Sequence, residues 1–114
     1  MFTQQILNKT MKLTVVMVAK NAGEVIEGAL KSVAGLWDEL LVSNQGSTDG
    51  TVETVKRYGG KIFQTNDINL GKRKQWLLDQ AKGDWILVLD SDERLSPDIK
   101  NEIRVVLKKL PQEI

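Results

Sequence analysis

Two carboxylates, Asp90 and Asp92, follow directly after an apolar run at residues 85–89. Side chains at positions i and i+2 of an extended chain leave on the same face, so both carboxylates are expected to point the same way where this strand opens into a loop. Such a pair suits a hard divalent cation that also binds diphosphate oxygens. The plainer interpretation is a polar strand end before a capped helix, because short acidic motifs are common. The surrounding elements favour the metal site.

Apolar stretches rich in β-branched residues alternate, from residue 11 onward, with apolar residues at helical spacing. The expected strands are residues 13–19, 39–43, 61–64 and 85–89. The expected helices are residues 21–36, 51–58, a third that contains 76–81 and ends near 82–83, and 96–110. Asn21 has Glu24 three residues on, which is the spacing of a capping box. Residues 59–60 are two glycines that stop the second helix, and Ser96 before Pro97 is typical of a helix start.

This order of elements predicts an α/β fold: a doubly wound, Rossmann-like, mainly parallel sheet of about four strands in the order 3-2-1-4. In such sheets the ligand crevice lies beyond the carboxyl ends of the strands, where the strand order reverses. Residues 19–21, 43–46 and 90–92 should therefore meet there. Residues 1–10 are expected to be an N-terminal extension outside the fold, and residues 11–114 to be a single domain.

The composition excludes several classes of protein. The chain has 114 residues, no cysteine, no histidine and a formal net charge of +1. Disulfide frameworks, thiolate sites, imidazole-based zinc sites and Ser-His-Asp triads are thus impossible within it. The charge gives no reason to expect a nucleic-acid partner. Neither a secretory signal nor a transmembrane segment is recognisable, so we expect a cytoplasmic protein, either free or peripheral at the inner face of the membrane.

The absence of two common nucleotide-binding motifs limits the classes of ligand that the sequence predicts. The first strand is not followed by G-x-G-x-x-G, and the chain contains no G-x-x-x-x-G-K-[ST], which argues against dinucleotides bound in the usual way and against P-loop nucleotide hydrolases. A phosphatase or phosphotransfer domain with an Asp nucleophile would carry it at the end of the first strand, where this chain has Ala-Lys-Asn at residues 19–21. A nucleotide whose diphosphate is bound through a metal at the Asp pair remains the best fit.

Three segments in this order, residues 15–21, 44–51 and 83–94, resemble family 2 glycosyltransferases of the GT-A fold. Within that family the chain is most similar to the bacterial branch that includes lipopolysaccharide-core glucosyltransferases. The resemblance covers roughly residues 11–110 and identifies that stretch as the nucleotide-sugar-binding half, a truncated GT-A domain. An ordered set of motifs is much more specific than any single one of them.

The resemblance implies a role for each matching residue. Asp92 would bind Mn²⁺ or Mg²⁺ that bridges the diphosphate of a nucleotide sugar, with a UDP-sugar expected, and Asp90 would lie near the ribose and a metal-bound water. Val18 and Lys20 would line the base pocket. Lys74 matches a basic position that faces the nucleotide, although a solvated charge at a helix start fits its residue type equally well.

The chain departs from the family pattern at Asn44, where the family usually has an Asp that accepts a hydrogen bond from the uracil N–H. An amide oxygen still accepts this bond, without the assistance of charge. Family members also continue well beyond this length, and that part supplies the acceptor site and the general base, so no catalytic residue is assigned. Asp49 is expected to cap the second helix and order its loop, and Asp98 and Glu102 to be helix-start and surface carboxylates.

The sequence therefore predicts a domain that binds a nucleotide diphosphate sugar, for transfer of a hexose to a saccharide or lipid-linked saccharide acceptor by the complete enzyme. The isolated chain is expected to be inactive. It is also expected to form a homodimer, either through the outer edge of the fourth strand or by exchange of the last helix. The alternative is a non-catalytic module that binds a nucleotide or associates with itself.

Overall fold

The computed structural model describes residues 2–4, 12–47, 49–64 and 69–108. Within this part of the chain, the strands form one sheet in the order β1-β5-β2-β3-β4. The strands are β1 (Phe2–Gln4), β2 (Leu13–Ala19), β3 (Glu39–Asn44), β4 (Lys61–Gln64) and β5 (Trp85–Val88). The helices are α1 (Ile26–Val33), α2 (Thr51–Arg57), α3 (Leu70–Gln80) and α4 (Pro97–Leu107).

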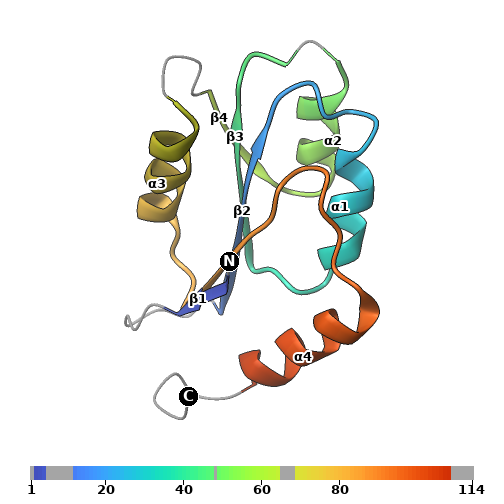
Figure 1. The fold of residues 1–114 in the computed structure, drawn as a ribbon, viewed down its shortest axis with the longest axis vertical. Coiled ribbons are helices and arrows are strands. Elements are labelled where there is room, and N and C mark those ends of the chain that lie inside the picture. Colours follow the sequence, from blue (N-terminus) through green and yellow to red (C-terminus); the bar gives the residue numbers. More distant parts are fainter. Residues whose placement is uncertain (1, 5–11, 48, 65–68, 109–114) are drawn as a thin grey trace.

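The parallel strands have the order β4-β3-β2-β5, which confirms the predicted order 3-2-1-4 and the doubly wound α/β class. Helices cover both faces of the sheet, with α3 on one face and α1 and α2 on the other (Figure 1). The continuous apolar runs of β2 and β3 are explained by this arrangement, because a strand covered on both faces has no solvent side. The smaller part of the core lies between the sheet and α3 and contains Val16, Leu41, Leu77, Ala81 and Ile86.

β1 corrects, for residues 2–4, the expectation that residues 1–10 stand outside the fold. Phe2–Gln4 pairs antiparallel with residues 85–87 of β5. An unpaired strand edge is a template for any extended segment that can reach it, and here the chain's own first residues take that place. The edge of β5 is therefore not free over residues 85–87, and the predicted dimer through this edge loses its basis there.

The predicted helix start at Asn21 and Glu24 is wrong, because α1 begins only at Ile26. Asn21 has a φ of 45°, outside the range of a helix N-cap, and its backbone N–H donates to Ser47 Oγ at 2.8 Å. The stretch between β2 and α1 is thus bound to the loop that follows β3. This pairing joins segments far apart in the sequence, so local spacing could not reveal it.

Two other boundaries are confirmed. Gly59 ends α2 in the left-handed conformation, with a φ of 80°, and the N–H of Gly60 donates back to the carbonyl of Val55 at 3.0 Å. Ser96 caps α4, since its hydroxyl accepts from the N–H of Ile99 at 3.2 Å.

Buried hydrogen bonds join the start of β5 to β2 and β3. Thr14 Oγ1 donates to Glu39 Oε1 at 2.9 Å and accepts from the N–H of Gly83 at 2.9 Å. The N–H of Lys82 also donates to Glu39 Oε1, at 3.0 Å. Because the strand that leads to Asp90 begins at this point, the network fixes where its carboxyl end emerges.

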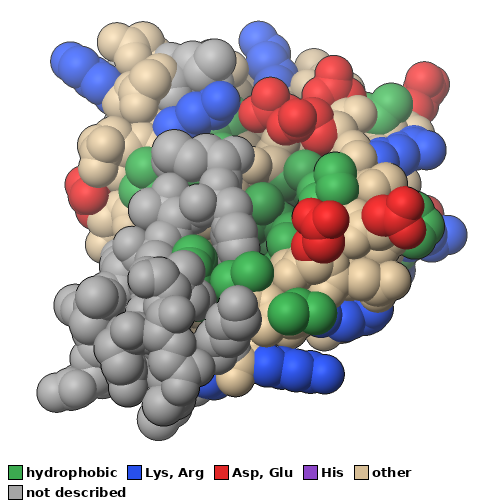
Figure 2. Space-filling model, turned by 60° about the horizontal axis from the view of Figure 1, so that its bottom comes forward, with side chains coloured by type: hydrophobic (Ala, Val, Ile, Leu, Met, Phe, Trp, Pro, Cys, Tyr) green, Lys and Arg blue, Asp and Glu red, His purple; other side chains and the backbone are tan. Residues whose placement is uncertain are grey.

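α4 lies against α1 with Ile103 buried, while Ile99 and Val105 are 48% and 58% exposed. Figure 2 shows the lower face of the molecule, where hydrophobic side chains reach the surface among acidic ones. Asp98 and Glu102 are exposed, as predicted. In the described part of the chain, none of the helices has both the length and the apolar character needed to cross a membrane.

Candidate functional site

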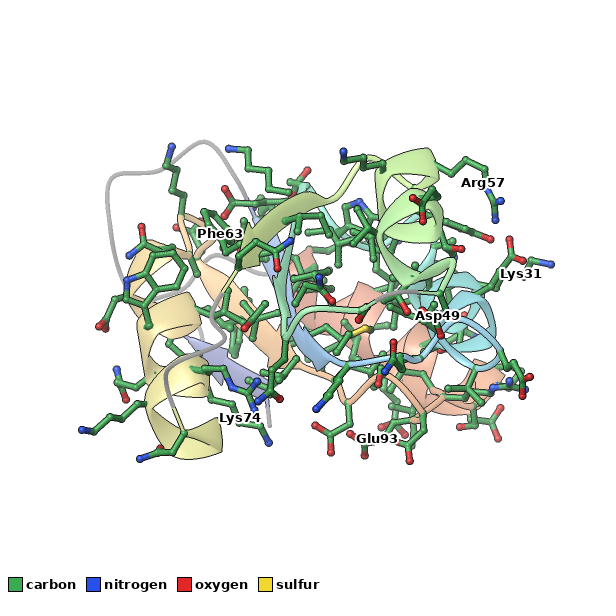
Figure 3. The ribbon with its side chains drawn as sticks, turned by 90° about the horizontal axis from the view of Figure 1, so that it is seen from above. Lys31, Asp49, Arg57, Phe63, Lys74 and Glu93 are labelled. Atoms are coloured by element: carbon green, nitrogen blue, oxygen red, sulfur yellow. The ribbon has the colours of Figure 1, made fainter. Side chains whose placement is uncertain are left out.

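The predicted site residues gather at the carboxyl ends of the parallel strands, seen from above in Figure 3. Val18 on β2 pairs with Ser43 on β3, and Val16 pairs with Val88 on β5. The ladder extends one residue further, because the N–H of Leu89 donates to the carbonyl of Val16 at 3.0 Å. The chain therefore leaves β5 beside the end of β2, as the strand order requires.

The loop that carries the two aspartates is a turn held by two hydrogen bonds between Asp90 and Glu93. The N–H of Asp90 donates to Glu93 Oε1 at 2.8 Å, and the N–H of Glu93 donates to the carbonyl of Asp90 at 2.9 Å. Asp92, between them in the turn, is exposed. The loop is also held to α1, because the N–H of Leu95 donates to Ser32 Oγ at 3.1 Å. Neither Glu93 nor Ser32 could be recognised from the sequence as a support of this loop.

Lys74 reaches the same loop from the opposite side. Its Nζ lies 3.5 Å from Asp90 Oδ1, and both side chains are partly exposed. Figure 3 shows Lys74 on the side of α3 and Glu93 on the loop after β5. The ion pair places Lys74 beside Asp90, and its expected role of facing the nucleotide stays a prediction.

Asn44 is 1% exposed and takes part in a network that the sequence did not predict. Its Nδ2 donates to Gln64 Oε1 at 3.1 Å, and its Oδ1 accepts from the hydroxyl of Ser47. The Ser47 hydroxyl in turn accepts from the N–H of Asn21. Asn44 thus joins the ends of β2, β3 and β4, and its Oδ1 retains a second lone pair for a ligand.

Asp49 orders its loop, as predicted, but the expected cap of the second helix is wrong, because the N-cap of α2 is Gly50, without a side-chain hydrogen bond. Its carboxylate accepts from the hydroxyl and the N–H of Thr51, the latter at 3.1 Å, and from the N–H of Gly23 at 3.0 Å. The hydrogen bond from the Thr51 hydroxyl, followed by that from the Gly23 backbone, lowers the pKa of Asp49 below its ordinary value of 3.8. The negative charge is thus used to hold the segment before α1 against the start of α2.

The Asp49→Asn substitution is expected to weaken the pH dependence of stability in acid. A carboxyl whose pKa is lower in the folded state stabilises the protein fully above its ordinary pKa, and this contribution is lost as the pH falls through the folded-state value. The variant should therefore be less stable than the wild type above pH 3.8 and approach it below. Chemical denaturation at several pH values measures this, with Glu102→Gln, an exposed carboxylate of α4, as the control. If the stability of the variant depended on pH in acid as strongly as that of the wild type, the assignment would be contradicted.

A cavity of about 400 Å³ lies on the α1 and α2 side of these loops. It is lined by Asn21, Ala22, Gly23, Glu24, Val25, Asp49 and Gly50. This lining contains neither Asp90 nor Asp92, so the aspartate loop does not form this cavity.

The aspartate loop offers a divalent cation an incomplete set of ligands. Among the residues that the structure describes, no group of three or more acidic, histidine or cysteine side chains comes together. Asp90 and Asp92 supply two carboxylates at most, whereas Mg²⁺ prefers about six ligands and usually keeps waters and substrate phosphates among them. The residues present thus fit a metal that arrives with a diphosphate, and do not fit a cation held by protein ligands alone.

Comparison with known proteins decides the family. The family model described as Glycosyl transferase family 2 matches residues 14–110. This chain belongs to that family. A Rickettsia bellii protein named as an uncharacterized glycosyltransferase is 32% identical over 104 residues, covering 91% of this chain and 35% of the relative. A Mycoplasma pneumoniae protein, also named as an uncharacterized glycosyltransferase, is 31% identical, covering 87% of this chain and 38% of the relative.

Solved structures of glycosyltransferases share the fold. TarS of S. aureus, residues 1–349, superposes with a TM-score of 0.69 at 26% identity, over 83% of this chain and 32% of that one. Glucosyl-3-phosphoglycerate synthase from Mycobacterium tuberculosis, solved with UDP, superposes with a TM-score of 0.58 at 27% identity, over 74% and 35%. The same synthase was also solved with Mn²⁺, UDP and glucosyl-3-phosphoglycerate. This family 2 chain has the GT-A fold and spans about a third of the length of these proteins.

Proposed function

We propose that this domain binds the nucleotide diphosphate sugar, a UDP-sugar, for a family 2 glycosyltransferase through a divalent metal, Mn²⁺ or Mg²⁺, at Asp90 and Asp92. The observation that carries the proposal is the convergence of the aspartate loop with Lys74 beside the end of β2, with 3.5 Å between Lys74 Nζ and Asp90 Oδ1. A cation and carboxylates close together provide both kinds of partner that a metal-diphosphate needs. The UDP and Mn²⁺ found with a structural neighbour support the choice of ligands.

Each side chain has a task in this proposal. Val18, partly exposed at the end of β2, packs against the base, and the neighbouring Lys20 is exposed beside it. Asn44 accepts from the base through the free lone pair of its Oδ1. Asp92 holds the metal, while Asp90 is positioned by Lys74 between the ribose and the metal. The metal, when bound, neutralises charge on the leaving diphosphate.

In the whole protein, this site would serve transfer of a hexose to a saccharide or lipid-linked saccharide acceptor. The cytoplasmic location, with or without attachment to the inner face of the membrane, belongs to the same proposal. The homodimer stays a prediction. With residues 85–87 of β5 paired to β1, the exposed face of α4 is the remaining surface on which we base it.

The experiment that tests the proposal is calorimetric titration of the chain with UDP, once with Mn²⁺ and once with EDTA. The carboxylates alone repel a diphosphate, so UDP should bind about tenfold more tightly or better with the metal. Equal affinity under both conditions would overturn the assignment.

A non-catalytic module is the second candidate, and the hydrogen bonds of Asn44 favour it. Both polar atoms of this amide already have partners in the chain, Gln64 and Ser47, as a structural residue would. Such a module would bind nucleotide weakly or without preference between bases. The two candidates are distinguished at position 44 itself.

The Asn44→Asp substitution is expected to tighten UDP by about 1 kcal/mol, the usual difference between a neutral and a charge-assisted hydrogen bond. The carboxylate keeps the acceptor for Ser47, and Gln64 can turn its amide to donate. CDP should gain much less, because cytosine lacks the N–H at that position. Calorimetry with both nucleotides measures this, and Asn101→Asp on α4 is the control. If UDP and CDP weaken alike, position 44 does not contact the base.

A further inference from the structure

Arg73 on α3 is a buried cation for which the described residues provide no anionic partner. It is 6% exposed, and among the described residues neither its Nε nor its Nη1 has a hydrogen-bond partner. The ion pairs of the described chain join other residues. Its neighbours in the sequence differ, since Lys72 is exposed and Lys74 reaches Asp90. A buried charge is costly unless it is compensated, so this arrangement calls for an anion.

The helix geometry places Arg73 at the carboxyl end of the sheet. Arg73 is four residues before Leu77, on the same helix face, and Leu77 is fully buried against Val16. α3 runs antiparallel to the parallel strands. Four residues back along the helix, about 6 Å, therefore correspond to two residues forward along a strand, about 6.6 Å. Arg73 is thus level with Val18 and its pair Ser43. Long side chains on a helix lean toward its N-terminus, which here is the end where the nucleotide site lies.

We propose that Arg73 is a further nucleotide-binding residue, whose buried positive charge is neutralised by the phosphates of the bound nucleotide. This inference rests on the proposed function, because it takes the diphosphate as the anion at this end of the sheet. A base carbonyl would leave the net charge uncompensated, whereas phosphates supply the opposite charge at a site of low dielectric, where such interactions are strong. Arg73 would then bind from beneath the site, on the side of α3, while Lys74 acts at the aspartate loop.

A residue with this role leaves a signature that a structural arginine does not. Removal of an uncompensated buried charge stabilises the free protein, and the same removal weakens the ligand that compensates it. Arg73→Met should therefore raise the midpoint of thermal unfolding without ligand by about 5 °C or more. The same variant should weaken UDP with Mn²⁺ by about tenfold or more.

The test combines thermal unfolding of the free chain with calorimetric titration by UDP and by uridine. Lys72→Met removes the same charge from an exposed neighbour and should change neither measurement. Arg73→Lys, which keeps the charge, should bind UDP within about threefold of the wild type. Uridine binding should be the same in Arg73→Met and in the wild type, because uridine carries no phosphate.

Four results would overturn the inference. A free Arg73→Met protein that is less stable than the wild type, with UDP binding unchanged, would make Arg73 structural. An equal loss of UDP and uridine would assign its contact to the base or to the shape of the pocket. If the wild-type chain does not bind UDP with Mn²⁺, both the proposed function and this inference are wrong. If the wild type and Arg73→Met bind UDP equally tightly, only the inference on Arg73 is wrong.

Discussion

Replacement of Asp92 by alanine is expected to abolish the difference between UDP binding with Mn²⁺ and UDP binding with EDTA. Asp92 is exposed in a turn that other residues hold, so its loss would remove the proposed metal ligand without removing a support of the loop. The loop keeps its hydrogen bonds between Asp90 and Glu93. The metal would then bind UDP in solution and no longer connect it to the protein. Calorimetric titration of the variant under both conditions measures the effect.

The matched control is Asp98→Ala, which removes an exposed carboxylate from the first turn of α4. This variant should bind UDP as the wild type does, with the tighter affinity in Mn²⁺. An Asp92→Ala protein that still binds UDP more tightly with Mn²⁺ would show that the metal is held elsewhere. The acidic side chains of Glu24 and Asp49 beside the 400 Å³ cavity would then be the next candidates.

The Gly83→Ala substitution is expected to destabilise the fold by about 3 kcal/mol. A Cβ at this position would lie 2.6 Å from the backbone N of Thr14 and 2.8 Å from its Oγ1. Backbone atoms cannot move aside as a flexible side chain can. The buried hydrogen bond from the Gly83 N–H to Thr14 Oγ1 would also be lost or distorted. Urea denaturation followed by circular dichroism measures the change.

Gly71→Ala provides the contrast, because a Cβ there meets nothing closer than Asn69 Oδ1 at 3.7 Å. Gly71 lies in α3, where alanine is favoured over glycine by up to about 1 kcal/mol. This variant should be as stable as the wild type or slightly more so. If Gly83→Ala were equally harmless, the junction between α3 and β5 would be looser than the described contacts require.

The parallel core of the fold could be predicted because its signals are local. β2, β3 and β5 each contain a continuous apolar run, and the β-branched residues of β2 fit a sheet covered on both faces. The Ser96 cap and the glycine at position 59 are also visible in the sequence, because each acts within one helical turn. The place of the Asp pair at the end of β5 followed from the apolar run before it and from the strand order.

The errors arose where distant segments decide the structure. Asn21 has the spacing of a capping box, yet its N–H goes to Ser47, 26 residues away. Phe2–Gln4 shows no pattern of its own and becomes a strand because the edge of β5 is available to it. Both outcomes depend on tertiary contacts that periodicity does not encode.

In the candidate site, too, residues with local signals could be predicted, whereas contacts between distant segments could not. Asp90 and Asp92 were found from their place at a strand end and from the resemblance, and Lys74 from the resemblance alone; the structure brings Lys74 to Asp90. The partners of Asn44 could not be found, because Gln64 reaches it only through the register of β3 and β4. Arg73 was hidden in a basic run that suggests a solvated surface, although its spacing of four from Leu77 signals the buried face of α3.

The most direct measurement is an amide ¹H–¹⁵N spectrum of the labelled chain with UDP and substoichiometric Mn²⁺, referenced to the same sample with Mg²⁺. Paramagnetic Mn²⁺ broadens the signals nearest to it, so it reports where the metal binds. A metal-diphosphate site at the Asp pair predicts broadening centred on residues 90–93, with Lys74 also affected. Broadening centred on Glu24 and Asp49, or no localised broadening in the presence of UDP, would contradict it.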